Sequence, residues 1–150
     1  MFPTLNLETL VTEIKTAIEK ENTHEVGKVI MLSFDEKNNA RILFENGKPK
    51  FADTIQEKIQ MYLQVLMRTG YEQYPVYEGT GFGMTYFNFR GKKLHPSIIT
   101  SEIKREVTEH LKKLSIFDRI EQFEANLTQT TLNIKFNLKL KDGSTLEISL

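Results

Sequence analysis

The feature that most constrains the fold of this chain is a regular alternation of apolar and polar residues near its C-terminus. Between residues 132 and 140, asparagine and lysine separate five apolar side chains: Leu132, Ile134, Phe136, Leu138 and Leu140. An alternation of period two predicts a strand with one buried face and one solvated face. Asp142-Gly143 then predicts a hairpin turn, followed by a last strand through residues 146–150. Residues 123–127 alternate in the same way, so the sequence predicts a C-terminal β-meander.

Three earlier segments repeat apolar residues every three to four positions, as an amphipathic helix does. They span residues 6–21, 53–69 and 96–114. We therefore predict an α+β fold, in which two or three amphipathic helices pack on an antiparallel sheet.

Local residues predict how these helices begin and end. Asp53 and Gln56 have the spacing of a capping box, and Gly70 stands where a left-handed C-terminal cap is expected. Pro96 lies near a position that helices tolerate in their first turn. The buried stripe predicted for the second helix is Ile55, Ile59, Tyr62, Leu63 and Leu66.

Residues 26–51 carry strand patterns instead of helical ones. A mostly apolar run at 29–34 predicts one strand, and residues 40–45 predict a second. Asn46-Gly47 predicts a two-residue hairpin, and Pro49 limits the strand after it to an edge or a short extension.

Composition excludes several classes of function. The chain has 150 residues, no cysteine and a formal net charge of zero, so we expect no disulfides, no thiolate metal site and no nucleic-acid partner. The histidines His24, His95 and His110 lie far apart and have no metal-ligand spacing. The glycines at 79–83 lack the ending of a phosphate-binding loop, so no cofactor is expected. Without a signal peptide or membrane span, we expect a soluble protein made in the cytosol.

No catalytic motif stands out in the sequence. Glu72, Glu78 and Asp118 are the carboxylates near aromatic segments, so a glycosidase-like acid–base pair is one alternative. Nothing in the sequence ties these residues to one another, and no serine or histidine stands in a nucleophile motif. We therefore do not expect an enzyme.

Two places in the chain are candidates for contacts with other proteins. At residues 116–120 the third predicted helix gives way to the strands, and Asp118 and Arg119 lie side by side between apolar residues. This pair is either a local polar cap of the helix end or a contact to a partner. The last predicted strand is either a short edge kept soluble by its neighbours or an edge that accepts a partner's strand.

The order of features between Phe44 and Ser149 resembles that of a known family. The segments that carry the resemblance are Phe44-Glu45-Asn46-Gly47, the helix from Asp53 that ends in Leu66-Met67-Arg68-Thr69, Tyr74-Pro75-Val76-Tyr77 with Gly81-Phe82-Gly83, Ser101-Glu102-Ile103 with Val107 to Leu111, Asp118-Arg119-Ile120, and the turn glycine Gly143. The family is the baseplate wedge or sheath-initiator family of contractile phage tails and injection systems, sometimes labelled lysozyme-like. On this basis we divide the chain into an extension, residues 1–43, and the family domain, residues 44–150.

The resemblance implies a wedge contact at the helix–sheet joint. Many family members carry Glu-Pro-Arg where this chain has Phe117, Asp118 and Arg119, so only the arginine is retained. An Asp-Arg version is familiar from prophages of Gram-positive hosts, and this chain resembles that branch. Either Phe117 or Asp118 would take the role of the missing glutamate. The expected partner at these residues is the helical core bundle of the other wedge subunits.

The resemblance also implies that the C-terminal strands pair with the first ring of sheath subunits and template sheath polymerisation. The predicted sheath-contact residues are Leu146, Glu147, Ile148, Ser149 and Leu150. The expected location is the tail baseplate of a virion or an injection-system particle, assembled in the bacterial cytoplasm, with tube or hub proteins as further partners. Because an anti-adaptor of the stress response is thought to share the fold, a regulatory binding module is the main alternative, ahead of a cell-wall glycosidase.

Overall fold

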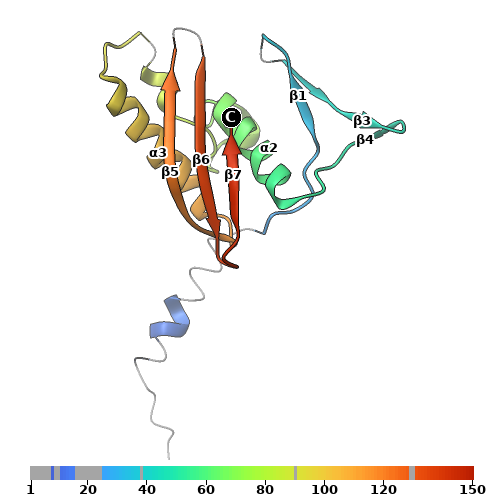
Figure 1. Cartoon of the computed structure of the whole chain (residues 1–150), viewed down its shortest axis with the longest axis horizontal. Helices are drawn as coiled ribbons and strands as arrows, with labels where there is room; N and C mark the ends of the chain where they lie inside the picture. The colour runs from blue at the N-terminus through green and yellow to red at the C-terminus, as the bar shows by residue number, and fades with distance from the viewer. Residues whose placement is uncertain (1–7, 9–10, 16–24, 38, 90, 129–130) are drawn as a thin grey trace, which may run out of the picture.

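A three-stranded antiparallel sheet forms the C-terminal part of the chain in the computed structural model, which describes residues 8, 11–15, 25–37, 39–89, 91–128 and 131–150. Its strands are β5 (Phe117–Leu127), β6 (Leu132–Leu140) and β7 (Thr145–Ser149), and the spatial order is β5-β6-β7. β6 therefore lies in the middle, with β5 and β7 at the two edges (Figure 1). The predicted meander is confirmed.

Side-chain alternation explains the two faces of this sheet. Ile134, Phe136 and Leu138 of β6 are buried, whereas Asn133 and Lys135 between them are exposed. The turn between β6 and β7 uses Gly143 at φ 88°, a left-handed conformation that glycine adopts without a steric cost. The sheet thus has an apolar face that must be covered and a polar face that water can solvate.

Two helices cover the apolar face. Helix α2 (Ile55–Arg68) contacts β7, and helix α3 (Pro96–Lys112) contacts β5 (Figure 1). Pro96 occupies the first turn of α3, as predicted, after the N-cap residue His95. One hydrophobic core joins both helices to the sheet, and this arrangement confirms the α+β fold. The fully buried side chains at its centre include Ile59, Leu63, Leu66, Ile103, Val107, Leu111, Ile134 and Ile148.

The predicted ends of α2 are wrong in two details. The capping box is formed by Thr54 and Glu57, one residue later than Asp53 and Gln56. The Thr54 hydroxyl accepts from the Glu57 N–H at 3.1 Å, while the Glu57 carboxylate accepts from the Thr54 N–H at 3.3 Å. This shift leaves the Gln56 side chain free to contact other parts of the chain.

At the other end of α2, Gly70 is not a left-handed cap. The C-cap is Thr69, in an extended conformation, and Gly70 forms an isolated parallel bridge with Met84. Pairing with Met84, which lies outside the helix, replaced the local cap that the sequence favours. In the predicted stripe Ile55 is wrong, because 40% of its surface is exposed at the first turn.

Two small hairpins precede α2. β1 (Leu32–Phe34) pairs with β2 (Ala40–Ile42), and β3 (Phe44–Glu45) pairs with β4 (Lys48–Pro49). The single strand predicted at 40–45 is interrupted at Leu43, whose N–H donates to Met31 at 3.0 Å and whose carbonyl accepts from Lys50 at 2.8 Å. The chain changes pairing partner at this residue. The predicted Asn46-Gly47 turn is confirmed, with φ of 51° and 74°.

The predicted first helix lies mostly outside the described residues. Residues 8 and 11–15 are helical, and about half of the Val11 and Ile14 side chains is exposed, at 48% and 49%. The boundary at residues 43 and 44 stays a prediction, and backbone hydrogen bonds link segments on its two sides.

Candidate functional site

The outer edge of β7 carries backbone groups that point away from the sheet. Ile134 and Leu150 exchange two backbone hydrogen bonds, of 3.1 Å and 2.9 Å. Because an antiparallel ladder alternates with period two, Ile148 and Leu146 also turn their N–H and C=O groups toward β6. The backbone groups of Thr145, Glu147 and Ser149, which form the outer edge of β7, therefore face outward.

Side chains on β7 divide between the core and solvent. Ile148 has 0% of its surface exposed, and Leu146 and Leu150 pack against the core. Glu147 and Ser149 are exposed. Of the predicted sheath-contact residues, three therefore anchor the strand in this subunit, and what β7 presents to a partner is its backbone edge with two polar side chains.

Helix α2 contacts the outer edge of β7 through two glutamines. The Gln56 side-chain amide donates to the Glu147 carbonyl at 2.9 Å, and that of Gln60 donates to the Ser149 carbonyl at 3.1 Å. These residues are absent from our sequence-based candidates. A pair of glutamines spaced by four on a helix is the only local trace of them, and it does not reveal which strand they reach.

The joint before the sheet is more strand-like than predicted. β5 begins at Phe117, so Asp118 and Arg119 lie in the strand, with a register shift between Phe117 and Arg119. Phe117 is 8% exposed and packs in the core. Asp118 and Arg119 are exposed, so these two are the residues that a partner can reach.

Arg119 binds two carboxylates of its own strand. Its Nη1 lies 2.8 Å from Asp118 Oδ2, and its Nε lies 2.9 Å from Glu121 Oε1. Hydrogen bonding to Glu121, with the charges of both carboxylates, raises the pKa of the Arg119 guanidinium. The alternative of a polar helix cap is not what forms, because both bonds stay within β5.

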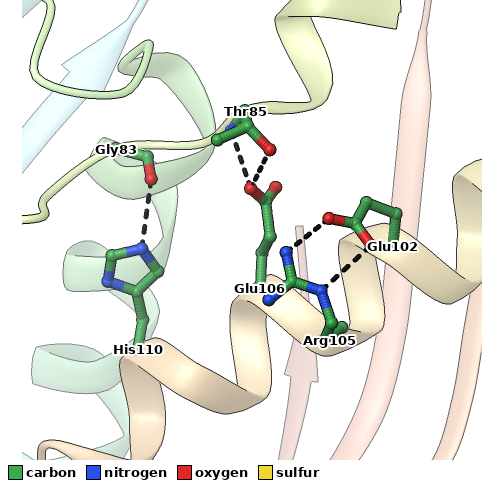
Figure 2. Close-up of polar contacts among 6 residues, drawn as sticks. All are labelled: Gly83, Thr85, Glu102, Arg105, Glu106 and His110. Atoms are coloured by element: carbon green, nitrogen blue, oxygen red, sulfur yellow. Dashed lines mark hydrogen bonds and ion pairs between the residues drawn. The ribbon is translucent and has the colours of Figure 1, made fainter.

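A buried polar cluster links α3 to the segment after Gly83 (Figure 2). The Glu106 Oε1 atom accepts from the Thr85 N–H at 2.8 Å and also from the Thr85 hydroxyl. One turn further along α3, His110 Nε2 lies 3.1 Å from the Gly83 carbonyl oxygen, to which it donates as the neutral tautomer. Glu106 and His110 are 5% and 7% exposed. Their spacing of four places both on the buried face of α3.

Burial favours the neutral form of this cluster's histidine. Removal from water lowers the pKa of the His110 ring, and nearby Lys113 lowers it further, against the Gly83 hydrogen bond and the charges of Glu106 and Glu109. Sequence reasoning missed Glu106. It could have been found from its place between Ile103 and Val107, in the buried repeat of the helix.

The comparison with protein-family models decides to which family the chain belongs. The model of the contractile injection system sheath initiator matches residues 30–143, about three quarters of the chain. The chain belongs to the sheath-initiator family. The match spans β1 to the turn before β7 and includes both helices. In the comparison with curated proteins, none matched this chain.

Membership of the sheath initiators gives the chain a structural role in a contractile injection system. It is part of a tail or injection particle and interacts with other tail or sheath proteins. The Gram-positive branch and the lysozyme-like label stay predictions. Among the described residues, no helix is long and apolar enough to cross a membrane.

The glycosidase alternative finds no support in this sheath initiator. Glu72 accepts from the Gly81 N–H at 3.0 Å and so closes a loop, while Asp118 pairs with Arg119. A pocket of about 370 Å³ lies between the segment at 25–29, α2 and the end of α3, and neither Glu72 nor Glu78 lines it. The described residues contain no group of three or more His, Asp or Glu side chains that could hold a metal.

Proposed function

We propose that this sheath initiator is a baseplate subunit that starts sheath polymerisation by accepting a strand from the first sheath ring at the outer edge of β7. The observation that carries the proposal is the edge position of β7, with the backbone groups of Thr145, Glu147 and Ser149 turned away from β6. A strand added there forms main-chain hydrogen bonds along its length, and these supply affinity without requiring a particular partner sequence.

The core holds this edge in a fixed position. Ile148 is fully buried between the sheet and the helices, and Leu146 and Leu150 pack beside it. A strand held at three alternate positions offers its outer groups in one register, so little entropy is lost when a partner strand is added. A rigid edge of this kind suits a template for ordered polymerisation.

The second proposed contact lies at the opposite edge of the sheet. Asp118 and Arg119 belong to β5, the other edge strand (Figure 1), so a wedge partner and a sheath partner can bind at the same time. The guanidinium of Arg119 uses two of its five N–H donors on Asp118 and Glu121. Three donors remain for a carboxylate or for helix-end carbonyls of the wedge core bundle.

The remaining surfaces and the setting complete the proposal. Residues 1–43 form an additional contact, for which the exposed apolar side chains Val11 and Ile14 are suited. Tube or hub proteins are further partners. The particle is a contractile tail or a related injection system, and the subunit joins its baseplate in the bacterial cytoplasm.

A proline at Glu147 tests the strand-addition step. Since the Glu147 N–H faces outward, Glu147→Pro removes a donor that only an added strand would use and leaves the β6 ladder intact. Glu147→Ala is the matched control, because it removes the same side chain and keeps the N–H. Truncation of β7 would be a poor test, since it removes the buried Ile148 from the core.

The measurement is sheath polymerisation seeded by each variant in the presence of baseplate and tube, followed by electron microscopy and light scattering. We expect Glu147→Pro to fold, to enter the baseplate and to leave the sheath unpolymerised, while Glu147→Ala seeds normally. Normal seeding by a folded Glu147→Pro variant would reject β7 as the sheath-binding edge.

A further inference from the structure

The two glutamines of α2 imitate part of a neighbouring strand. Gln56 and Gln60 donate to the carbonyls of Glu147 and Ser149, two residues apart on β7. A strand paired with β7 would place its own N–H groups at these same two carbonyls. The side-chain amides of the helix therefore occupy two of the three outward carbonyls of β7, the ones on Glu147 and Ser149.

The spacing of the two elements makes this match possible. Four residues of an α-helix rise about 6 Å, and two residues of an antiparallel strand rise about 6.8 Å. Gln56 contacts Glu147 and Gln60 contacts Ser149, so α2 and β7 run in the same direction here. Figure 1 shows α2 beside β7, on the side away from β6.

We propose that Gln56 and Gln60 guard the outer edge of β7, closing it to strand addition in the free subunit and releasing it when the sheath strand replaces them. This inference rests on the proposed function, because the sheath strand is the partner that displaces the guard. The glutamines belong to α2, not to the strand, so the edge opens by side-chain rotation without a change in the core.

The two glutamines bond two outward carbonyls of β7 and leave the outward N–H groups accessible. In the part of the chain that the structure describes, the outward N–H groups of Glu147 and Ser149 have no protein acceptor and face solvent. An arriving strand can bind these N–H groups with its carbonyls first. Its N–H groups then compete with the glutamine amides for the two carbonyls, so only a strand that pairs over several residues gains from the exchange.

Such protection has a physical purpose in a subunit that waits for its partner. An exposed edge strand pairs readily with other edges, including that of a second copy of the same chain. Hydrogen bonds from helix side chains to the edge carbonyls reduce this risk. They do so without a charged residue or a β-bulge in the edge strand. The edge stays available to a partner that is held beside it in the growing particle.

Methionine substitutions separate the amide bonds from the bulk of the side chains. Gln56→Met with Gln60→Met keeps the length of both side chains and their helix propensity but removes both donors. Gln64→Met is the matched control. Gln64 lies one further step of four along α2, and within the described residues its side chain makes no hydrogen bond to β7.

The first readout is the rate at which each immobilised variant captures the sheath protein of the same particle. We expect the double variant to capture it about three- to tenfold faster than the unsubstituted chain. This factor corresponds to about one net hydrogen bond that the unsubstituted chain must break before the rate-limiting step of strand addition. Gln64→Met should not differ from the unsubstituted chain. Adding Glu147→Pro to the double variant should abolish the gain. An unchanged rate, or a gain that persists with the proline, would overturn the guard.

The second readout needs no sheath protein. In sedimentation velocity of the chain alone, the double variant should self-associate at concentrations where the unsubstituted chain and Gln64→Met do not, and Glu147→Pro should reverse this. If no variant captures the sheath protein, the proposed function fails. Self-association then tests, without the sheath protein, whether Gln56 and Gln60 close the edge of β7 to strand addition. A double variant that self-associates no more than the control would then refute the guard.

Discussion

The carboxylate of Glu106 accepts hydrogen bonds from both the backbone N–H and the hydroxyl of Thr85, and so ties helix α3 to the segment that follows α2. Its second oxygen, Oε2, is buried and has no partner among the described residues. Both bonds therefore fall on one atom of a buried carboxylate. Loss of either bond leaves a buried polar group less well compensated.

Thr85→Val tests the worth of this contact. The substitution removes the hydroxyl donor and keeps the backbone donor, and we expect it to lower the free energy of unfolding by about 1.5–3 kcal/mol. Thr108→Val on the same helix is the control, because its hydroxyl donates to the Lys104 carbonyl at an exposed position. Urea unfolding measures both variants. Equal effects would show that the Glu106 contact contributes nothing particular.

His110 should make stability fall in mild acid. Burial lowers the pKa of the folded ring below its ordinary value of 6.5. Below about pH 6.5 the unfolded state then binds more protons than the folded state, so the free energy of unfolding decreases as pH falls toward the folded pKa. At higher pH the contribution is complete.

The matching variant is His110→Gln, which can still donate to the Gly83 carbonyl but does not titrate. We expect its stability to change less than that of the unsubstituted chain between pH 7.5 and pH 5, measured by urea unfolding at each pH. The exposed carboxylates with lowered pKa values, such as Glu57 and Asp142, lose their protonation-dependent contributions only at lower pH. Parallel curves for the two proteins would rule out His110 as the source.

Gly83→Ala should be far more disruptive than the loss of other glycines. At φ 113° an added Cβ would lie 2.3 Å from the Gly70 carbonyl oxygen, which is backbone that cannot move aside alone. We expect a loss of more than about 3 kcal/mol, or no cooperative folding. Gly79→Ala is the control, since its φ is 74° but no atom lies within 4 Å, and it should cost about 1 kcal/mol. Thermal unfolding followed by circular dichroism compares them.

Arg119→Ala should affect assembly and not folding. The Arg119 side chain is exposed and bound to two exposed carboxylates, and such pairs add little to stability. We expect an unchanged melting temperature with weaker retention in purified wedge complexes. Arg105→Ala, which breaks an exposed pair with Glu102 on α3, should change neither quantity. Equal retention of both variants would remove Arg119 from the proposed wedge contact.

Local patterns in the sequence determined much of this architecture. The alternation at 132–140 determined β6 and the face it buries, because a strand alternates its side chains whatever surrounds it. Asn46-Gly47 and Asp142-Gly143 determined two turns, because their backbone conformations favour those residues. The helical repeats placed α2 and α3 to within a few residues.

Only the tertiary structure decided which polar residues meet. Gln56 and Glu147 are 91 positions apart, and Thr85 and Glu106 are 21 apart, so no local period records either contact. Gly70 and Leu43 depart from the predicted pattern because each bonds to backbone outside its own predicted element: Gly70 pairs with Met84, and Leu43 bonds to Met31 and Lys50. Residue type and spacing determine the faces of helices and strands, but packing those faces together determines which side chains reach the edge of β7.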